Sequence, residues 1–178
     1  PPTAGFPLGT DESGRSILAL IVWGARISLV VGLAATVMSM LIGTVIGIMS
    51  GYFRGGLGLV LNRFTDWFLV IPFLPLAIVL ATVLGASLIN IIVVIGITSW
   101  PGTARLVRSQ TLSIGARPYL ERARALGAGD AHLMRRHILP NTLTPVLVAA
   151  TLNLGLAILS EATLSFLGVG MPITQPSL

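Results

Sequence analysis

An uncharged stretch from residue 27 to residue 53 constrains the fold of this chain more than any other feature. Arg26 precedes it and Arg54 follows it. An α-helix rises about 1.5 Å per residue, so roughly 20 apolar residues cross the hydrocarbon core of a bilayer. The stretch therefore predicts a transmembrane helix over about residues 27–50. Gly43 and Gly47 lie four residues apart within it, a spacing that lets membrane helices approach closely.

A second uncharged stretch, residues 67–104, is too long for one crossing of the membrane and about the right length for two. Its natural break lies at residues 85–90, because the glycine, serine and asparagine found there favour turns. We therefore predict one transmembrane helix over about residues 66–84 and another over about residues 88–105.

Prolines lie near the start of two predicted spans. Pro72 and Pro75 should kink the second span, because proline lacks a backbone N–H and its ring clashes with the preceding turn. A last uncharged stretch, residues 138–160, has Pro140 near its start. It predicts a fourth span over about residues 140–161.

The composition supports this assignment. Hydrophobic residues make up 54% of the chain and charged residues 10%, and the mean hydropathy is +0.92. About a quarter of the residues in a soluble domain are charged, because its exterior faces water. This chain lacks the charges to build such an exterior. The predicted fold class is therefore all-α, a polytopic membrane bundle with four spans in this sequence.

The positions of the arginines predict the sidedness of the bundle. Residues 51–62 and 105–139 connect spans on the same side of the membrane, and together with Arg63 they hold nine of the eleven basic residues. Lys and Arg accumulate in cytoplasmic loops, so this side is predicted to be cytoplasmic. The nine are Arg54, Arg63, Arg105, Arg108, Arg117, Arg122, Arg124, Arg135 and Arg136.

The opposite side then holds both ends of the sequence. Residues 1–26 are predicted to form an extracytoplasmic loop and a short interfacial helix over residues 16–25, with Trp23 at the level of the lipid headgroups. The tail, residues 165–178, is also predicted to lie outside. The chain begins without Met and ends abruptly, so we expect it to be a piece of a longer protein.

The cytoplasmic segment, residues 106–139, is predicted to contain two short helices. Pro118 suits the first position of the first helix, and Gly127 is a stop signal after it. Asp130 could cap the second helix. The residues alone leave two interpretations open: a helix pair resting on lipid headgroups, or a docking site for a partner protein.

A few polar residues within or beside the spans are candidates for function. Glu161 is the one acid late in a span; it could line a gate or bond to Ser160, Thr163 or the backbone, and substrate contact is a weaker alternative. Asn90 and Asn153 could line a polar pathway or bond across helices. Asp66 and Arg63, three residues apart, predict a local ion pair.

Several chemistries are excluded by what the sequence lacks. Without lysine there is no Walker A loop and no Schiff-base lysine, and without cysteine there is no thiolate metal site or thiol nucleophile. His132 and His137, five residues apart, are predicted to lie on different helical faces, so we expect no metal site. A sequence pI near 11.4 could suggest nucleic acid, but arginines placed between membrane-length runs favour topology signalling instead.

The cytoplasmic segment resembles a known motif. Glu121, Ala123 and Gly127 are followed, after nine intervening residues, by His137-Ile-Leu-Pro140-Asn. This pattern resembles the EAA loop of permease subunits of binding-protein-dependent ABC importers. Arg122 replaces the first alanine of that motif. The histidine form of the second half is similar to the dipeptide, oligopeptide and nickel permease branch.

Three further segments resemble the same branch, in the same order along the chain. Residues 9–15, GTDESGR, resemble its external GTDxxGRD segment, and residues 24–29, GARISL, resemble its GARxSL entry to a span. Residues 161–168, EATLSFLG, resemble its EAxLSFLG segment. The resemblance thus covers nearly the whole chain.

The resemblance implies a fold and a set of partners. It implies a six-span subunit of the type I ABC importer kind, of which residues 27–178 would supply four spans. The EAA loop would dock on an ATPase subunit, so the coupling residues would be Glu121, Arg122, Ala123, Arg124, Leu126, Gly127, His137 and Pro140. Expected partners are a second, different permease subunit, two ABC ATPases that bind ATP and Mg²⁺, an extracytoplasmic binding protein and lipid, but not nucleic acid.

The implied function is import of di- or oligopeptides across a bacterial cytoplasmic membrane, with no cofactor and no catalysis in this chain. Nickel or glutathione import is an alternative within the same architecture. A secondary transporter or channel predicts ionisable groups on several spans, whereas Glu161 stands nearly alone here. An intramembrane enzyme would need a nucleophile–base pair or a metal constellation, and the sequence offers neither.

Overall fold

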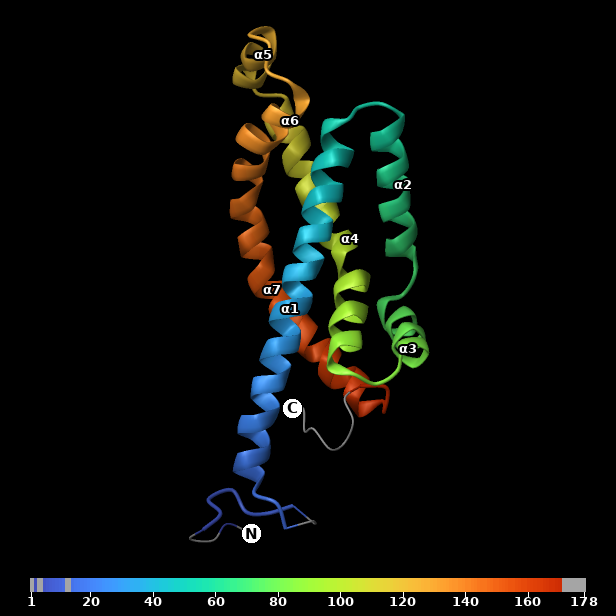
Figure 1. The fold of residues 1–178 in the computed structure, drawn as a ribbon, viewed down its shortest axis with the longest axis vertical. Coiled ribbons are helices and arrows are strands. Elements are labelled where there is room, and N and C mark those ends of the chain that lie inside the picture. The colour runs from blue at the N-terminus through green and yellow to red at the C-terminus, as the bar shows by residue number, and fades with distance from the viewer. Residues whose placement is uncertain (1, 3–4, 12–13, 171–178) are drawn as a thin grey trace.

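The computed structural model describes residues 2, 5–11 and 14–170, and all of its regular elements are helices. Figure 1 shows an elongated bundle in which α1, α4 and α7 run along the long axis, with α2 and α3 beside them. The short helices α5 and α6 cap one end, and the N-terminal loop lies at the other. The elements are α1 (Ile17–Tyr52), α2 (Gly56–Val70), α3 (Phe73–Leu84), α4 (Leu88–Gly115), α5 (Pro118–Ala125), α6 (Asp130–Leu133), the π-helical turn η1 (Met134–Ile138) and α7 (Leu139–Phe166).

Helix α1 is longer than predicted. Its N-terminus is capped by Ser16, whose Oγ accepts a hydrogen bond from the Ala19 backbone N–H at 3.4 Å. From there the helix continues without a break to Tyr52, so the predicted separate interfacial helix over residues 16–25 is instead the first turns of α1. No proline interrupts this part of the chain, and its Ala, Leu and Ile residues tolerate helix.

The second predicted span is divided between α2 and α3, which bend by 90° at their junction. Pro72 forces the preceding Ile71 into an extended conformation (ψ 123°), so the chain cannot continue as one helix. Helix α2 also starts at Gly56, well before the predicted residue 66. Within the described residues, three helices are long and apolar enough to cross a membrane, and the number is four if this bent pair is counted as one span.

The other two spans also run past their predicted limits. Helix α4 starts near the predicted residue 88 but continues to Gly115 rather than ending at 105. Helix α7 is preceded without interruption by α6 and η1, so one helical path runs from Asp130 to Phe166. The π turn widens the helix just before Pro140, where a normal α-turn would clash with the proline ring.

Close packing of α1 against α4 holds the bundle together. A stripe of glycines at positions 43, 47 and 51 faces α4. A Cβ added at Gly47 would lie 2.7 Å from the carbonyl oxygen of Ala104, and one at Gly43 would lie 2.8 Å from that of Trp100. These distances leave no room for a side chain, so the predicted glycine contact is confirmed and extended by one turn.

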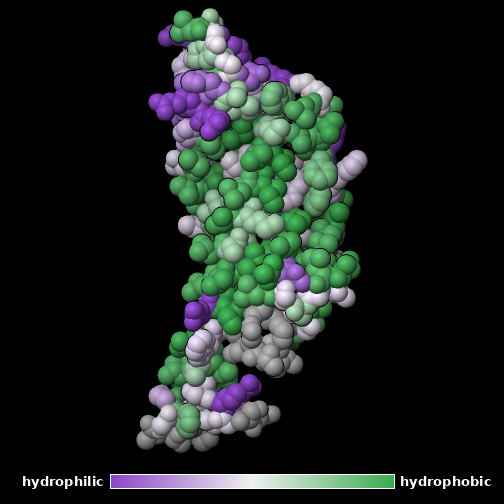
Figure 2. Space-filling model, viewed as in Figure 1, coloured by the Kyte–Doolittle hydropathy of each residue, from purple (hydrophilic) through white to green (hydrophobic). Residues whose placement is uncertain are grey.

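The surface shows a broad band of apolar residues and one strongly polar end. Figure 2 shows hydrophobic side chains over the middle of the bundle and hydrophilic ones gathered over α5 and α6. Large residues such as Leu41, Val60 and Leu152 are well exposed within this band. An apolar girdle of this kind matches the hydrocarbon core of a bilayer.

Candidate functional site

The segment between α4 and α7 forms a compact polar end of the bundle. Pro118 occupies the first turn of α5, as predicted, and Leu120 anchors the helix by inserting into a buried cluster with Val107 and Leu133. Gly127 ends the turn after α5 with a φ of +89°, a conformation that glycine adopts without strain. Its role as a stop signal is therefore confirmed.

Most of the residues predicted for docking lie on the outside of this segment. Glu121, Arg122 and Arg124 are exposed, and Leu126 is 89% exposed at the tip. Ala123 is half-buried and packs against the cluster that holds Leu120. The segment thus exposes charged groups and Leu126 on its outer side, while Leu120 and Ala123 pack into the buried cluster on its inner side.

His137 and Pro140 lie apart from that tip. His137 belongs to the π turn, and its ring lies 5.8 Å from that of His132 and 5.9 Å from that of Tyr119. The two histidines therefore share a face, contrary to the prediction, because a π turn brings residues five apart together. Within the described part of the chain, no group of three His, Cys, Asp or Glu residues could hold a metal ion.

A hydroxyl at the end of α1 joins the polar segment to the spans. The Tyr52 Oη donates a hydrogen bond to Asp130 Oδ1 at 2.5 Å and accepts one from Arg124 Nη2 at 3.1 Å. The bond with Tyr52 raises the pKa of Arg124, so its guanidinium remains charged. Asp130 was predicted to cap the next helix, but Gly129 is the N-cap there and the Asp130 carboxylate instead binds Tyr52.

These groups line a groove of about 350 Å³ between α1, α4 and the polar segment. Its lining includes charged residues of both signs, Arg54 and Glu121 among them. The sequence analysis did not identify Tyr52 as a site residue. Its position could have suggested it, because an aromatic residue with a polar hydroxyl at the end of an apolar run commonly marks the membrane interface.

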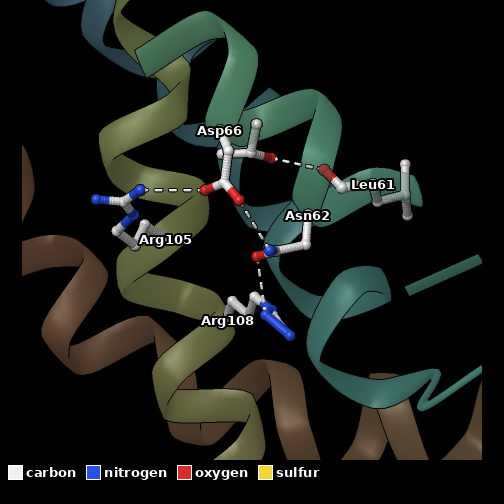
Figure 3. Close-up of polar contacts among 6 residues, drawn as sticks. Leu61, Asn62, Asp66, Arg105 and Arg108 are labelled. Carbon is white, nitrogen blue, oxygen red and sulfur yellow. Dashed lines mark hydrogen bonds and ion pairs between the residues drawn. The ribbon is translucent and has the colours of Figure 1, made fainter. Parts of the chain in front are cut away.

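A second polar network joins α2 to α4 (Figure 3). Arg105 Nη2 donates to Asp66 Oδ1 at 3.1 Å, and Arg108 Nη1 donates to Asn62 Oδ1 at 2.9 Å. Asn62 also donates to Asp66 Oδ2 at 3.1 Å. The predicted pairing of Asp66 with Arg63 is therefore wrong. Asp66 pairs with Arg105 of the facing helix α4 rather than with Arg63 of its own helix.

Glu161 lies buried near the far end of the bundle. Its Oε2 accepts a hydrogen bond from Ser28 of α1 at 2.9 Å, and its Oε1 accepts one from Ser165 at 2.9 Å. The predicted donors Ser160 and Thr163 bond to backbone carbonyls of their own helix instead. The carboxylate thus ties α7 to α1.

The two asparagines have different surroundings. Asn153 donates to Thr103 Oγ1 at 3.3 Å and lines a cavity of about 260 Å³ between α1, α3, α4 and α7. Thr36 and Ser39 also line this cavity, and their buried hydroxyls have no hydrogen-bond partner within the described residues. Asn90, by contrast, donates to the carbonyls of Leu84 and Gly85, so it organises the α3–α4 loop.

The fold and these sites define a polytopic α-helical membrane protein with a structured polar segment at one end of the bundle. Residues 43–178 match the binding-protein-dependent transport system inner membrane component family, and the chain belongs to that family. The predicted family and fold class are thereby confirmed.

Curated relatives are similar over nearly the whole chain. The glutathione transport system permease protein GsiD of Pectobacterium atrosepticum is 37% identical over 98% of this chain and 58% of its own length. The dipeptide transport system permease protein DppC of Alkalihalophilus pseudofirmus is 39% identical over the same shares. The oligopeptide transport system permease protein OppC of Lactococcus lactis subsp. cremoris is 38% identical over 100% of this chain and 61% of its own. The chain thus spans about three fifths of the length of these relatives.

A solved structure has the same fold. It is described as the crystal structure of an amino acid ABC transporter with histidines. The two chains superpose with a TM-score of 0.63 over 85% of this chain and 73% of the other, at 22% sequence identity.

Proposed function

We propose that this chain is part of the transmembrane permease subunit of an ATP-driven importer for di- or oligopeptides. The relatives named for dipeptide and oligopeptide transport support this, and so does the helical bundle. A relative named for glutathione transport is equally similar, and glutathione is itself a small peptide. The proposal therefore includes it as a second candidate cargo. The chain acts in transport, not in catalysis.

The segment from α5 to η1 docks on an ATPase subunit in this proposal. The observation that carries it is the exposure of Leu126 at the tip of a segment whose base is fixed by buried Leu120. A bare leucine surrounded by charges suits a groove on a protein, because burial there removes apolar surface from water. The exposed Glu121 and Arg122 of α5 pair with charges at the rim of that groove.

Partners supply the remaining functions. A second, different permease subunit encloses the translocation path with this one, and two ATPases bind ATP and Mg²⁺. An extracytoplasmic binding protein delivers cargo to the end of the bundle that holds residues 5–11. The arginine-rich segment then lies in the cytoplasm and the bundle in the bacterial cytoplasmic membrane.

The cavity beside Asn153 forms part of the path in this proposal. Its hydroxyl and amide groups can bond to a peptide backbone, which has both donors and acceptors. Glu161 acts as a structural tie beside that path rather than as a cargo ligand, since its oxygens already bond to Ser28 and Ser165.

A substitution at Gly127 tests the docking proposal. The positive φ at this position penalises every other residue, so Gly127→Val should distort the tip that carries Leu126. In the full transporter we expect peptide uptake to be lost and the bound ATPase to dissociate or to run uncoupled, while the permease still inserts. Gly129→Ser is the control, because Gly129 has an ordinary φ and open space around it and serine also suits its N-cap position. Normal uptake by the Gly127 variant would overturn the docking role.

A further inference from the structure

Three separate parts of the chain meet at a single oxygen, the hydroxyl of Tyr52. Tyr52 is the last residue of α1, Arg124 belongs to α5, and Asp130 is the first residue of α6. The hydroxyl donates to Asp130 at 2.5 Å and accepts from Arg124 at 3.1 Å. No other described hydrogen bond between side chains connects α1 to the segment from α5 to η1.

The Arg124 side of this contact is held in two ways. Its guanidinium carbon lies 5.7 Å from the centroid of the Tyr52 ring, in addition to the hydrogen bond to the hydroxyl. Asp130 supplies the opposite charge across the same hydroxyl. A bond flanked by a cation and an anion is stronger than one between neutral groups.

Apolar packing around Tyr52 is separate from this bond. The ring packs against a buried cluster that includes Ile48, Val107, Leu120 and Leu133, and it meets Phe53 edge-on at 5.3 Å. These contacts hold the segment near α1 whether or not the hydroxyl is present. The hydroxyl therefore fixes the orientation of the segment more than its attachment.

We propose that Tyr52 is a positioning residue for energy coupling: its hydroxyl joins the ATPase-docking segment to α1, so that movement of α5 is passed to the spans. This rests on the proposed docking function of α5. Through α1 the link reaches the glycine contact with α4 and the Ser28–Glu161 bond to α7. Through Asp130 it reaches α7 along the helix itself.

Tyr52→Phe is the decisive variant, because it removes the hydroxyl and keeps the ring. The full transporter, with its ATPase subunits and binding protein, is reconstituted in liposomes, and peptide uptake and ATP hydrolysis are measured together. We expect the ATPase to stay bound and ATP hydrolysis to continue. Uptake per ATP should fall about tenfold, the scale of losing one charge-assisted hydrogen bond.

Ser109→Ala is the control. Ser109 lies on α4, outside the docking segment, and its hydroxyl donates to the Leu106 carbonyl of the same helix at 2.8 Å. Its loss should leave uptake per ATP unchanged. A fall in both variants would indicate a general effect of removing a hydroxyl from this region, and the positioning role would be rejected.

A double-mutant cycle tests whether Tyr52 acts through Asp130. Asp130→Ala, which removes the acceptor, should by itself also lower uptake per ATP, and the double variant should be little worse than either single one. If the two substitutions lowered uptake per ATP independently, so that their effects multiplied in the double variant, the proposed link through Asp130 would be overturned. A Tyr52→Phe transporter whose uptake per ATP stays within about twofold of wild type would also overturn it, since changes that small are the usual scatter of unrelated substitutions.

The same experiment separates this proposal from the docking proposal. If α5 does not dock, no ATPase co-purifies through it, and Gly127→Val has no effect. If docking is correct but the Tyr52 link is not, Gly127→Val abolishes uptake while Tyr52→Phe remains coupled. The two failures therefore give different results.

Discussion

At the scale of single residues, the buried carboxylate of Glu161 is the most demanding feature of the spans. A charge or hydrogen-bonding group removed from water is costly unless neighbours satisfy it. Ser28 and Ser165 each donate one hydrogen bond to it. Removing Glu161 therefore takes away the acceptor of the buried Ser28 hydroxyl, whereas removing Ser28 leaves the carboxylate with the bond from Ser165 alone.

Two substitutions at this position should differ in stability. Glu161→Gln keeps an acceptor for Ser28 and should unfold nearly as wild type does. Glu161→Leu leaves the buried Ser28 hydroxyl without its acceptor, which should cost about 1–3 kcal/mol. Thermal unfolding of the detergent-solubilised transporter measures the difference. Ser160→Ala, which removes a bond within one helix turn, is the control, and equal stability of the Gln and Leu variants would contradict the role of the bond.

Sequence reasoning found the polar residues more reliably than it found their partners. Asp66 was paired with Arg63 because residues three apart are neighbours on a helix. The structure pairs it with Arg105, a residue of a different helix. Spacing along the chain predicts contacts within a helix, but contacts between helices depend on which faces pack together. Tyr52 was missed for the same reason, since Asp130 lies far from it in the sequence.

At the scale of elements, the glycine stripe of α1 sets the distance to α4. Gly47→Ala would place a Cβ 2.7 Å from a backbone oxygen of α4, and that oxygen cannot move without moving the helix. We expect a loss of about 1–3 kcal/mol of stability from overpacking. The transporter should show this as a lower unfolding temperature.

The matched control is Gly102→Ala on α4. Gly102 is also within a helix, but a Cβ there would meet nothing within 4 Å. Alanine favours helix over glycine by roughly 1 kcal/mol, so this variant should be neutral or slightly more stable. If both substitutions destabilise equally, close packing of α1 on α4 is not the cause.

The prolines show what sequence can and cannot predict about an element. Pro72 was expected to kink a span, and it does end α2. The bend of 90° was not predictable, because it depends on how α3 packs against α4. Pro140 was expected near the start of a span. The π turn that precedes it could not be predicted, because the hydrophobic pattern does not distinguish a π turn from an α-helical turn.

At the scale of the whole molecule, the chain has one polar, arginine-rich end and one end that carries the N-terminal loop. The hydrophobic runs were enough to predict the membrane class and the approximate positions of the spans. The ends of the helices could not be predicted from these runs, because α1 begins at Ile17, ahead of Arg26, and α4 continues past Arg105 into polar sequence. The predicted tail lies in part at residues 171–178, outside the described residues.

These 178 residues contain no cysteine, so introduced cysteines allow a direct test of sidedness. A single cysteine at exposed Phe6 should react in intact cells with a membrane-impermeant maleimide, and one at exposed Leu126 should not. In inside-out vesicles the result should reverse. Labelling of Leu126→Cys in intact cells would place the polar segment outside and contradict the assignment from the arginines.

The helical path from Asp130 to Phe166 has a mechanical consequence. It contains 37 residues, so at about 1.5 Å per residue it is a rod of roughly 55 Å, longer than the hydrocarbon core is thick. Pro140 and Pro145 lack a backbone N–H, so the helix has no hydrogen bond donated at either position. Bending is therefore easiest at these two prolines, near the Asp130 end, and the stretch beyond Pro145, which carries Glu161, turns as one stiff unit.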